Sequence, residues 1–171
     1  MIIVEGPDGC GKSTLIKQLL HRIPKLEFGE HSPGPPKSAE EYLARAAKWL
    51  IKPQEKTRNI ILDRFLFSEQ VYGPVLRGKL IITQKEMDIL EAKLLEHDPL
   101  IIYCRRPPHK LHLNDKDHIS GVSEKISQLV RQYDKIFSTW TIPKRLVVYD
   151  YEQVGLLSDV ILEVMNYLEE V

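Results

Sequence analysis

Residues 6–13 read Gly6-Pro7-Asp8-Gly9-Cys10-Gly11-Lys12-Ser13, and the fold prediction starts from this motif. Two glycines separated by four residues and followed by a lysine and a serine form a pattern typical of loops that bind a phosphate chain. The apolar run Ile2-Ile3-Val4 precedes the stretch, and an amphipathic helical pattern follows it over residues 15–23. A strand, a glycine-rich loop and a helix in this order are the context that the pattern requires.

Each residue type in this loop has a chemical use toward a nucleoside triphosphate. The glycines let consecutive backbone N–H groups point at phosphate oxygens, and Lys12 adds a positive charge near the outer phosphates. Ser13 offers a hydroxyl oxygen to Mg²⁺, and the helix that begins near Lys12 turns its positive end toward the same anion. We therefore expect Mg²⁺ as cofactor and ATP as ligand of a loop comprising Gly6, Gly9, Cys10, Gly11, Lys12, Ser13 and Thr14.

Along the rest of the chain, apolar runs of strand character alternate with helical stretches. Strands are expected at 2–4, 26–28, 60–62, 100–103 and 146–149, and such nearly continuous apolar runs are typical of parallel sheets covered on both faces. Two of the intervening helices have capping signals, Ser38 with Glu41 and Thr83 with Glu86. The predicted fold class is α/β, a P-loop NTPase-type three-layer sandwich in which helices flank a five-stranded parallel sheet.

Length and composition limit the other classes of protein. A chain of 171 residues with 43% hydrophobic residues is expected to form a single domain, residues 1–171. Its 24 Lys and Arg balance 24 Asp and Glu, so no overall charge attracts a nucleic acid polymer or an anionic membrane. Without an apolar run near the roughly 20 residues that cross a bilayer, and without a secretory leader, we expect a cytoplasmic protein. Cys10 and Cys104 are expected to be reduced thiols.

A second motif lies at the end of the third expected strand. The run Ile60-Ile61-Leu62 ends in Asp63, a carboxylate that can hold Mg²⁺ together with Ser13. Motor ATPases usually place a glutamate directly after this aspartate to activate water, but Arg64 stands there. The motif therefore favours phosphoryl transfer to a bound acceptor over hydrolysis.

Two separated motifs resemble the thymidylate kinase family. The opening Ile2–Thr14, with Glu5 before the loop and Asp8-Gly9 inside it, is similar to the start of those enzymes. The same holds for Asp63-Arg64-Phe65 with Ser68, Tyr72 and Gly73, and for Ile51-Lys52-Pro53 before it. The likeness is good over residues 1–75 and weak beyond them.

The resemblance implies transfer of the ATP γ-phosphate to a deoxynucleoside monophosphate, with dTMP or a related pyrimidine deoxynucleotide as acceptor. It implies that Asp8 lies near the metal and the acceptor sugar, that Arg64 binds the acceptor phosphate, and that Tyr72 packs under the sugar. It leaves a homodimer as a possible assembly. Candidates for contacts with the base are Phe65, Tyr42, Arg45 and Trp49.

The chain also departs from that family. After the second strand it reads His31-Ser32-Pro33-Gly34 where bacterial thymidylate kinases carry Arg-Glu-Pro-Gly. The sequence therefore does not determine which nucleobase the acceptor carries. A second resemblance, of Tyr103-Cys104-Arg105 and Pro108, is to deoxynucleoside kinases. Those enzymes need a carboxylate base at the end of the second strand, a place that Glu30 can fill. A nucleotide-binding module without turnover is a third interpretation.

The segment after the fourth expected strand is polar from Pro107 to Ser120. It resembles the lid that closes over ATP and excludes water, so we expect a lid at about 107–120. Because this segment contains no arginine, Arg105 and Arg106 before it are the cations expected to act in the transition state, beside Lys12 and Arg64.

Overall fold

The computed structural model describes residues 1–31, 34–111, 121–139, 145–150, 152–153 and 155–170. Its strands are β1 (Ile2–Glu5), β2 (Glu27–His31), β3 (Ile60–Asp63), β4 (Leu100–Cys104) and β5 (Leu146–Tyr149). Its α-helices are α1 (Lys12–Arg22), α2 (Ala39–Leu50), α3 (Leu66–Tyr72), α4 (Gln84–Glu96), α5 (Val122–Ser138) and α6 (Leu156–Glu169). Short helical turns are η1 (Gln54–Lys56), η2 (Gly73–Arg77, a π-helical turn) and η3 (Pro108–Lys110).

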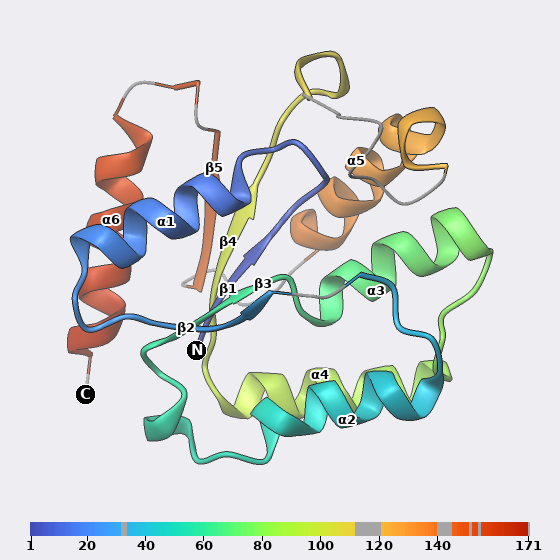
Figure 1. Cartoon of the computed structure of the whole chain (residues 1–171), viewed down its shortest axis with the longest axis horizontal. Helices are drawn as coiled ribbons and strands as arrows, with labels where there is room; N and C mark the ends of the chain where they lie inside the picture. Colours follow the sequence, from blue (N-terminus) through green and yellow to red (C-terminus); the bar gives the residue numbers. More distant parts are fainter. Residues whose placement is uncertain (32–33, 112–120, 140–144, 151, 154, 171) are drawn as a thin grey trace.

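The strands form one parallel sheet in the order β2-β3-β1-β4-β5. β1 lies in the centre, with β3 on one side and β4 on the other, so the loop after β1 lies between the ends of its two neighbours (Figure 1). Open α/β sheets bind their ligands at this carboxyl edge. The five-stranded sheet predicted from the sequence is confirmed.

Helices cover both faces of the sheet and give the molecule three layers (Figure 1). On one face, α1 and α6 bury Leu15, Leu19 and Val164 against alternate strand residues such as Ile2 and Val4. The other face is covered by α2, α3, α4 and α5, whose apolar side chains pack against the remaining strand residues. Because successive strand residues point to opposite faces, the apolar runs supply both cores, and the predicted three-layer sandwich is confirmed.

The capping signals in the sequence mark real helix starts. The Ser38 hydroxyl accepts a hydrogen bond from the Glu41 backbone N–H at 3.2 Å at the start of α2. Thr83 and Glu86 form a reciprocal capping box at the start of α4. Each pair satisfies backbone donors that an α-helix leaves without partners in its first turn.

The second strand differs from its prediction because it contains a bulge. The apolar pattern predicts a strand over 26–28, but β2 continues to His31, with a register shift between Phe28 and Glu30. A Cβ on Gly29 would lie 2.5 Å from Ile60 Cγ2 and 2.7 Å from Leu62 Cδ2, so only glycine allows this approach to β3. The bulge carries Glu30 to the carboxyl edge of the sheet, opposite Leu62.

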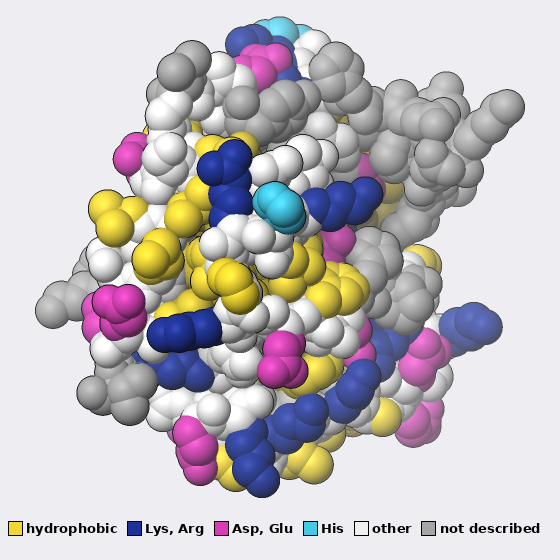
Figure 2. Space-filling view, turned by 60° about the vertical axis from the view of Figure 1, so that its left-hand side comes forward, with side chains coloured by type: hydrophobic (Ala, Val, Ile, Leu, Met, Phe, Trp, Pro, Cys, Tyr) yellow, Lys and Arg dark blue, Asp and Glu magenta, His cyan; other side chains and the backbone are white. Residues whose placement is uncertain are grey.

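The predicted lid falls only partly within the described residues. Pro107 to Leu111 are described and include η3, whereas residues 112–120 lie outside the described part of the chain. The face that carries α1 and α6 shows Lys, Arg, Asp and Glu side chains interspersed with hydrophobic ones (Figure 2). Among the described residues, no helix is both long enough and apolar enough to cross a bilayer.

Candidate functional site

The phosphate-binding loop passes close to the end of β4. Gly6 has φ 143°, and a Cβ there would lie 2.3 Å from the Cys104 carbonyl oxygen. Gly11 has φ 88° and caps the N-terminus of α1. Both positions require glycine, the first for close approach and the second for a left-handed backbone. Gly9 is left-handed as well, at φ 74°.

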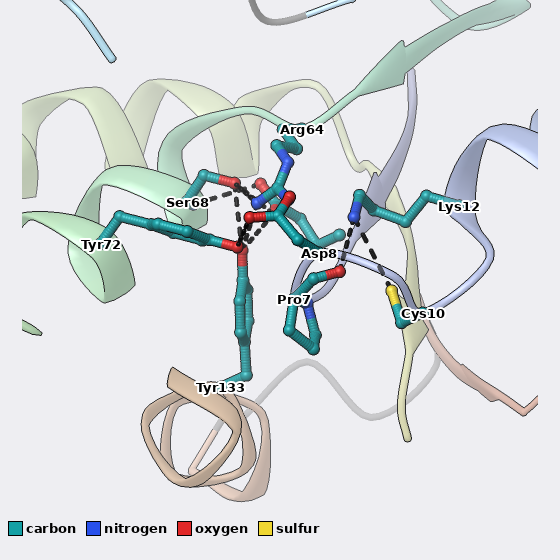
Figure 3. A network of polar contacts seen from close by, with 9 residues as sticks. Pro7, Asp8, Cys10, Lys12, Arg64, Ser68, Tyr72 and Tyr133 are labelled. Atoms are coloured by element: carbon teal, nitrogen blue, oxygen red, sulfur yellow. Dashed lines mark hydrogen bonds and ion pairs between the residues drawn. The ribbon is translucent and has the colours of Figure 1, made fainter. Parts of the chain in front are cut away.

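Lys12 lies over this loop. Its ammonium donates a hydrogen bond to the Pro7 carbonyl oxygen at 2.7 Å and lies 3.7 Å from Cys10 Sγ (Figure 3). Ser13 and Thr14, in the first turn of α1, are exposed to solvent. The first turn of α1 contains no acidic residue, so nothing there neutralises the positive end of the helix. This arrangement suits a phosphate anion.

The Cys10 thiol lies buried inside the loop, next to the buried Cys104. Burial alone would raise the pKa of Cys10, but the hydrogen bond with Cys104 and the charge of Lys12 outweigh it and lower that pKa. The expectation of two reduced thiols agrees with the free cysteines of the structure.

Arg64 joins the loop to the end of β3. Its backbone has φ 71°, a left-handed conformation, and its N–H donates to the Val4 carbonyl oxygen at 2.9 Å. Its guanidinium forms an ion pair with Asp8 and donates to the Tyr133 hydroxyl at 3.2 Å. It also lies over the Tyr72 ring, 4.8 Å from the centroid, while the Tyr72 hydroxyl donates to Asp8 at 3.1 Å (Figure 3). The structure thus brings the predicted Asp8, Arg64 and Tyr72 together.

Beneath this cluster lies the fully buried carboxylate of Glu5. It accepts hydrogen bonds from the Phe65 N–H at 2.6 Å, the Ser68 hydroxyl at 2.7 Å and the Tyr133 hydroxyl at 3.2 Å. Burial raises the pKa of Glu5, and the nearby Arg64 charge opposes this rise. Glu5 therefore ties β1, the start of α3 and α5 together under Arg64.

Sequence reasoning gave neither Glu5 nor Tyr133 a role of its own in the site. A charged residue closing an apolar strand was a signal for Glu5, because an acidic group is rarely fully buried without partners. No comparable signal existed for Tyr133, whose hydroxyl reaches the site across 128 residues of sequence separation from Glu5.

An open pocket lies beside Arg64. Arg45 is held at its wall by an ion pair with Glu41 and by a long 3.4 Å contact with the Gly34 carbonyl oxygen. Glu30 pairs with Lys48 at 2.5 Å. The pocket is lined by Glu30, Tyr42, Arg45, Ala46, Arg64, Phe65 and Leu66.

Three of the predicted site residues, Trp49, Arg105 and Arg106, do not line this pocket. Trp49 is buried at 4% exposure and is not among the residues that line the pocket, and its Cη2 would lie 3.0 Å from a Cβ added to Gly29. Arg106 has no exposed side-chain surface, forms an ion pair with Glu152 and donates to the Lys110 carbonyl oxygen at 2.7 Å. Arg105 is exposed and donates to Asp134 at 2.8 Å. The sequence placed both arginines at the correct strand end, but their charge partners come from distant segments.

The donor set at the loop fits Mg²⁺. Asp63 ends β3, is buried at 3% exposure and pairs in register with Val4, just before the loop. Its carboxylate and the Ser13 hydroxyl are hard oxygen donors, which Mg²⁺ prefers. Across the described residues, no group of three or more His, Cys, Asp or Glu side chains could hold a metal ion. Mg²⁺ bound through phosphates and one or two protein oxygens needs no such cluster.

Comparison with known proteins gives relatives of modest identity. The SPβ prophage-derived uncharacterized protein YorR of Bacillus subtilis (strain 168) is 28% identical over 146 residues, which span 81% of this chain and 82% of YorR. A thymidylate kinase of Mycoplasma mobile is 28% identical over 89% of this chain and 90% of its own length. A thymidylate kinase of Dehalococcoides mccartyi is 34% identical over 95 residues, 51% of this chain and 45% of the enzyme. No family model matches the chain.

Solved structures share the fold. The crystal structure of Bacillus subtilis YorR in complex with phosphorylated GDP matches with a TM-score of 0.72 at 22% identity, over 96% of this chain and 95% of YorR. Deoxyadenosine kinase from M. mycoides with bound dCTP matches with a TM-score of 0.60 at 19% identity, over 97% of this chain and 99% of the enzyme. These likenesses show an α/β P-loop fold.

Proposed function

We propose that this protein is an ATP-dependent kinase that transfers the γ-phosphoryl group to a deoxynucleoside monophosphate, with dTMP or a related pyrimidine deoxynucleotide as the acceptor. The observation that carries the proposal is the position of Arg64, which pairs with Asp8 in the phosphate-binding loop and also lines the adjoining pocket. One guanidinium thereby lies between the site for the donor phosphates and the site for an acceptor.

In the proposed reaction, an ionised oxygen of the acceptor phosphate attacks the γ-phosphorus, and the bond from that phosphorus to the β–γ bridging oxygen breaks to leave ADP. Lys12 and the loop N–H groups bind the outer phosphates, and Arg64 binds the acceptor phosphate. Ser13 and Asp63 would hold Mg²⁺, which neutralises charge on the donor phosphates. Tyr72, packed under Arg64, would contact the sugar.

The charges of the pocket support a phosphorylated acceptor. A monophosphate presents an oxygen that is already ionised, so it needs cations rather than a general base. Two of the lining residues, Arg45 and Arg64, carry guanidinium groups, which bind phosphate oxygens through paired N–H donors. YorR, described in complex with phosphorylated GDP, and the thymidylate kinase relatives further support a nucleotide as ligand.

The proposal is tested by measuring ADP release with MgATP against a panel of deoxynucleoside monophosphates and the corresponding nucleosides. Turnover with monophosphates is expected, and Lys12→Ala and Arg64→Ala should each lower kcat/KM more than about 100-fold, the scale of losing a transition-state contact of about 3 kcal/mol. Arg22→Ala, in the last turn of α1 and hydrogen-bonded only to Gln18 among the described residues, serves as the charge-matched control. An Arg64→Ala enzyme with near-normal kinetics would contradict the proposed role.

A second candidate, a deoxynucleoside kinase, is favoured by the position of Glu30. The bulge in β2 carries this carboxylate to the pocket wall, where it could accept the proton of a nucleoside 5′-hydroxyl. Deoxyadenosine kinase from M. mycoides shares the fold. Turnover with nucleosides alone, abolished in Glu30→Gln, would favour this candidate. A monophosphate kinase should keep most of its activity in that variant.

A further inference from the structure

The hydroxyl of Tyr133, on α5, lies between a cation and an anion of the site. It accepts a hydrogen bond from Arg64 Nη1 at 3.2 Å and donates one to Glu5 Oε2, also at 3.2 Å. Figure 3 shows this hydroxyl pointing into the cluster that contains Arg64, Ser68 and Tyr72. A hydroxyl has one proton to donate and two lone pairs, whereas a guanidinium only donates and a carboxylate only accepts. Tyr133 therefore connects the guanidinium of Arg64 with the buried carboxylate.

Packing holds the Tyr133 side chain in one place. The residue is fully buried, and its ring stacks on Tyr103 with the centroids 5.8 Å apart and the planes at 23°. It also meets the Tyr72 ring edge-on, at 6.3 Å between centroids. The Tyr103 hydroxyl in turn donates at 2.9 Å to Asp134, the next residue of α5. Side chains packed in this way keep one rotamer, so the Tyr133 hydroxyl has a fixed position relative to the sheet.

The hydroxyl also keeps its proton. Burial raises the pKa of Tyr133, and the negative charge of Glu5 raises it further, against the opposing charge of Arg64. At neutral pH Tyr133 is therefore a neutral hydroxyl, which can donate to Glu5 and accept from Arg64 at the same time.

The two terminal nitrogens of the Arg64 guanidinium have different partners. Nη1 donates to Tyr133 and, at a longer 3.4 Å, to Ser68 Oγ. Nη2 pairs with Asp8, a side chain of the phosphate-binding loop that is 21% exposed. An anion that binds Arg64 can replace Asp8 at Nη2, whereas replacing the fully buried Tyr133 at Nη1 would require the core to open. One side of the guanidinium is therefore anchored and the other can exchange its partner.

We propose that Tyr133 is a positioning residue for the transfer reaction: its hydroxyl holds Nη1 of Arg64, so that Nη2 exchanges Asp8 for the acceptor phosphate without the guanidinium turning away. Ser68 supports the same nitrogen through its longer contact. In this role Tyr133 touches neither substrate and acts only through Arg64. The inference rests on the proposed function, because it takes the acceptor phosphate to be the ligand of Arg64.

The variant Tyr133→Phe removes the hydroxyl and keeps the ring. We expect kcat/KM for the best monophosphate acceptor to fall about tenfold, less than after loss of a direct transition-state contact, while KM for ATP stays unchanged. In the Arg64→Ala background, adding Tyr133→Phe should cost no further activity, because the hydroxyl then has no guanidinium to hold. An unchanged kcat/KM in the single variant, or losses that add up in the double variant, would overturn the proposal.

Tyr167→Phe is the matched control for the loss of a buried hydroxyl. Tyr167 is almost as buried, at 1% exposure, and its hydroxyl donates at 3.0 Å to the carbonyl oxygen of Asp98, which precedes β4 at the amino edge of the sheet. Both variants should lower the melting temperature, since each leaves a buried partner with one hydrogen bond fewer. Only Tyr133→Phe should lower kcat/KM. Equal losses of activity in the two variants would contradict the proposal and leave Tyr133 a structural role only.

A binding assay without ATP separates failure of this inference from failure of the proposed function. The shift in melting temperature with each monophosphate, minus the shift with the matching nucleoside, measures what the phosphate group contributes to binding. If no monophosphate is phosphorylated, but this contribution is present in wild type and reduced in Tyr133→Phe, the kinase proposal fails and the anchoring of Arg64 by Tyr133 stands. If monophosphates are phosphorylated with equal kcat/KM by both proteins, the role of Tyr133 fails and the kinase proposal stands.

Discussion

Arg64 keeps a backbone conformation that non-glycine residues rarely adopt, with φ 71°. A left-handed residue with a Cβ costs roughly 1–2 kcal/mol, and such positions persist only where the surroundings hold them. Here the Val4 carbonyl oxygen accepts from the Arg64 N–H, and the Glu5 carboxylate accepts from the N–H of the next residue, Phe65. Strain of this kind gathers at functional sites, in keeping with the role proposed for Arg64.

Glu5→Gln tests whether the buried carboxylate positions Arg64. A glutamine can keep its oxygen toward the Phe65 and Ser68 N–H groups, but its NH₂ then makes the hydroxyls of Ser68 and Tyr133 accept instead of donate. It also removes the negative charge beside Arg64. We expect kcat/KM to fall more than about tenfold, the lower range for losing a well-placed electrostatic contact. Glu86→Gln, at the exposed start of α4, controls for the lost charge. Glu5 would have no positioning role if the two variants had equal activity.

The pH profile gives an independent reading of Glu5. Its pKa is raised above 4.5 by burial, so the folded chain binds this proton more tightly than the unfolded chain. The contribution of Glu5 to stability therefore increases as pH falls through the raised pKa, whereas activity falls, because a protonated carboxyl accepts fewer hydrogen bonds. We expect an acid limb in kcat/KM above pH 4.5 that disappears in Glu5→Gln. The same limb in both proteins would assign it to another group.

At the scale of elements, the phosphate-binding loop is shaped by its contact with β4. A Cβ on Gly6 would meet the Cys104 carbonyl oxygen at 2.3 Å and Cys10 Sγ at 2.9 Å. A backbone carbonyl within a parallel sheet has little freedom to move, so the loop itself would be displaced. The geometry of the loop therefore depends on two elements at once.

Gly6→Ala should destabilise the protein by on the order of 3 kcal/mol, from overpacking together with strain at φ 143°, and should abolish stabilisation by MgATP. Gly78→Ala is the matched control, because Gly78 has φ +75° and nothing lies within 4 Å of the added Cβ. That variant should lose only the roughly 1–2 kcal/mol of backbone strain and keep its response to MgATP. The free energy of unfolding and its increase on addition of MgATP are both measured by urea unfolding, with and without the nucleotide.

The elements that sequence predicted well are those with local signals. Ser38 and Thr83 mark helix starts because capping involves residues three positions apart, and the strands were found from short apolar runs. The bulge at Gly29 was not predicted from the sequence, because it depends on contacts with β3. In the same way, the loop and Asp8, Arg64 and Tyr72 were named from motifs, whereas the burial of Arg106 depends on Glu152, 46 residues away.

At the scale of the whole molecule, the sheet separates two cores that serve different parts of the site. The core shared by α1 and α6 supports the phosphate-binding loop, whereas the core under α3 and α5 supports Arg64. In the second core, Phe67 and Phe137 have ring centroids 5.2 Å apart, next to Tyr103 and Tyr133. Both cores use side chains of the same strands, so we expect them to unfold together.

Leu19→Ala and Phe67→Ala probe the two cores separately. Both side chains are fully buried, and truncation should cost about 2–5 kcal/mol for leucine and 3–5 kcal/mol for phenylalanine. Circular dichroism and tryptophan fluorescence should report a single shared unfolding transition in each variant. Phe67→Ala should also raise KM for the acceptor, because Phe67 precedes Ser68 in the Arg64 network. Two separate transitions would show that the cores are independent.

The ion pair between Arg106 and Glu152 limits which substitutions either position can tolerate during evolution. Exchange of Glu152 alone would remove the carboxylate that pairs with a guanidinium of no exposed side-chain surface, which should destabilise the protein, whereas exchange of both residues for apolar ones of similar volume is tolerated in many proteins. Positions 106 and 152 should therefore covary among related sequences. Sequences that lose the acid at 152 should also have lost the arginine at 106, along with the connection it makes between the segments after β4 and β5.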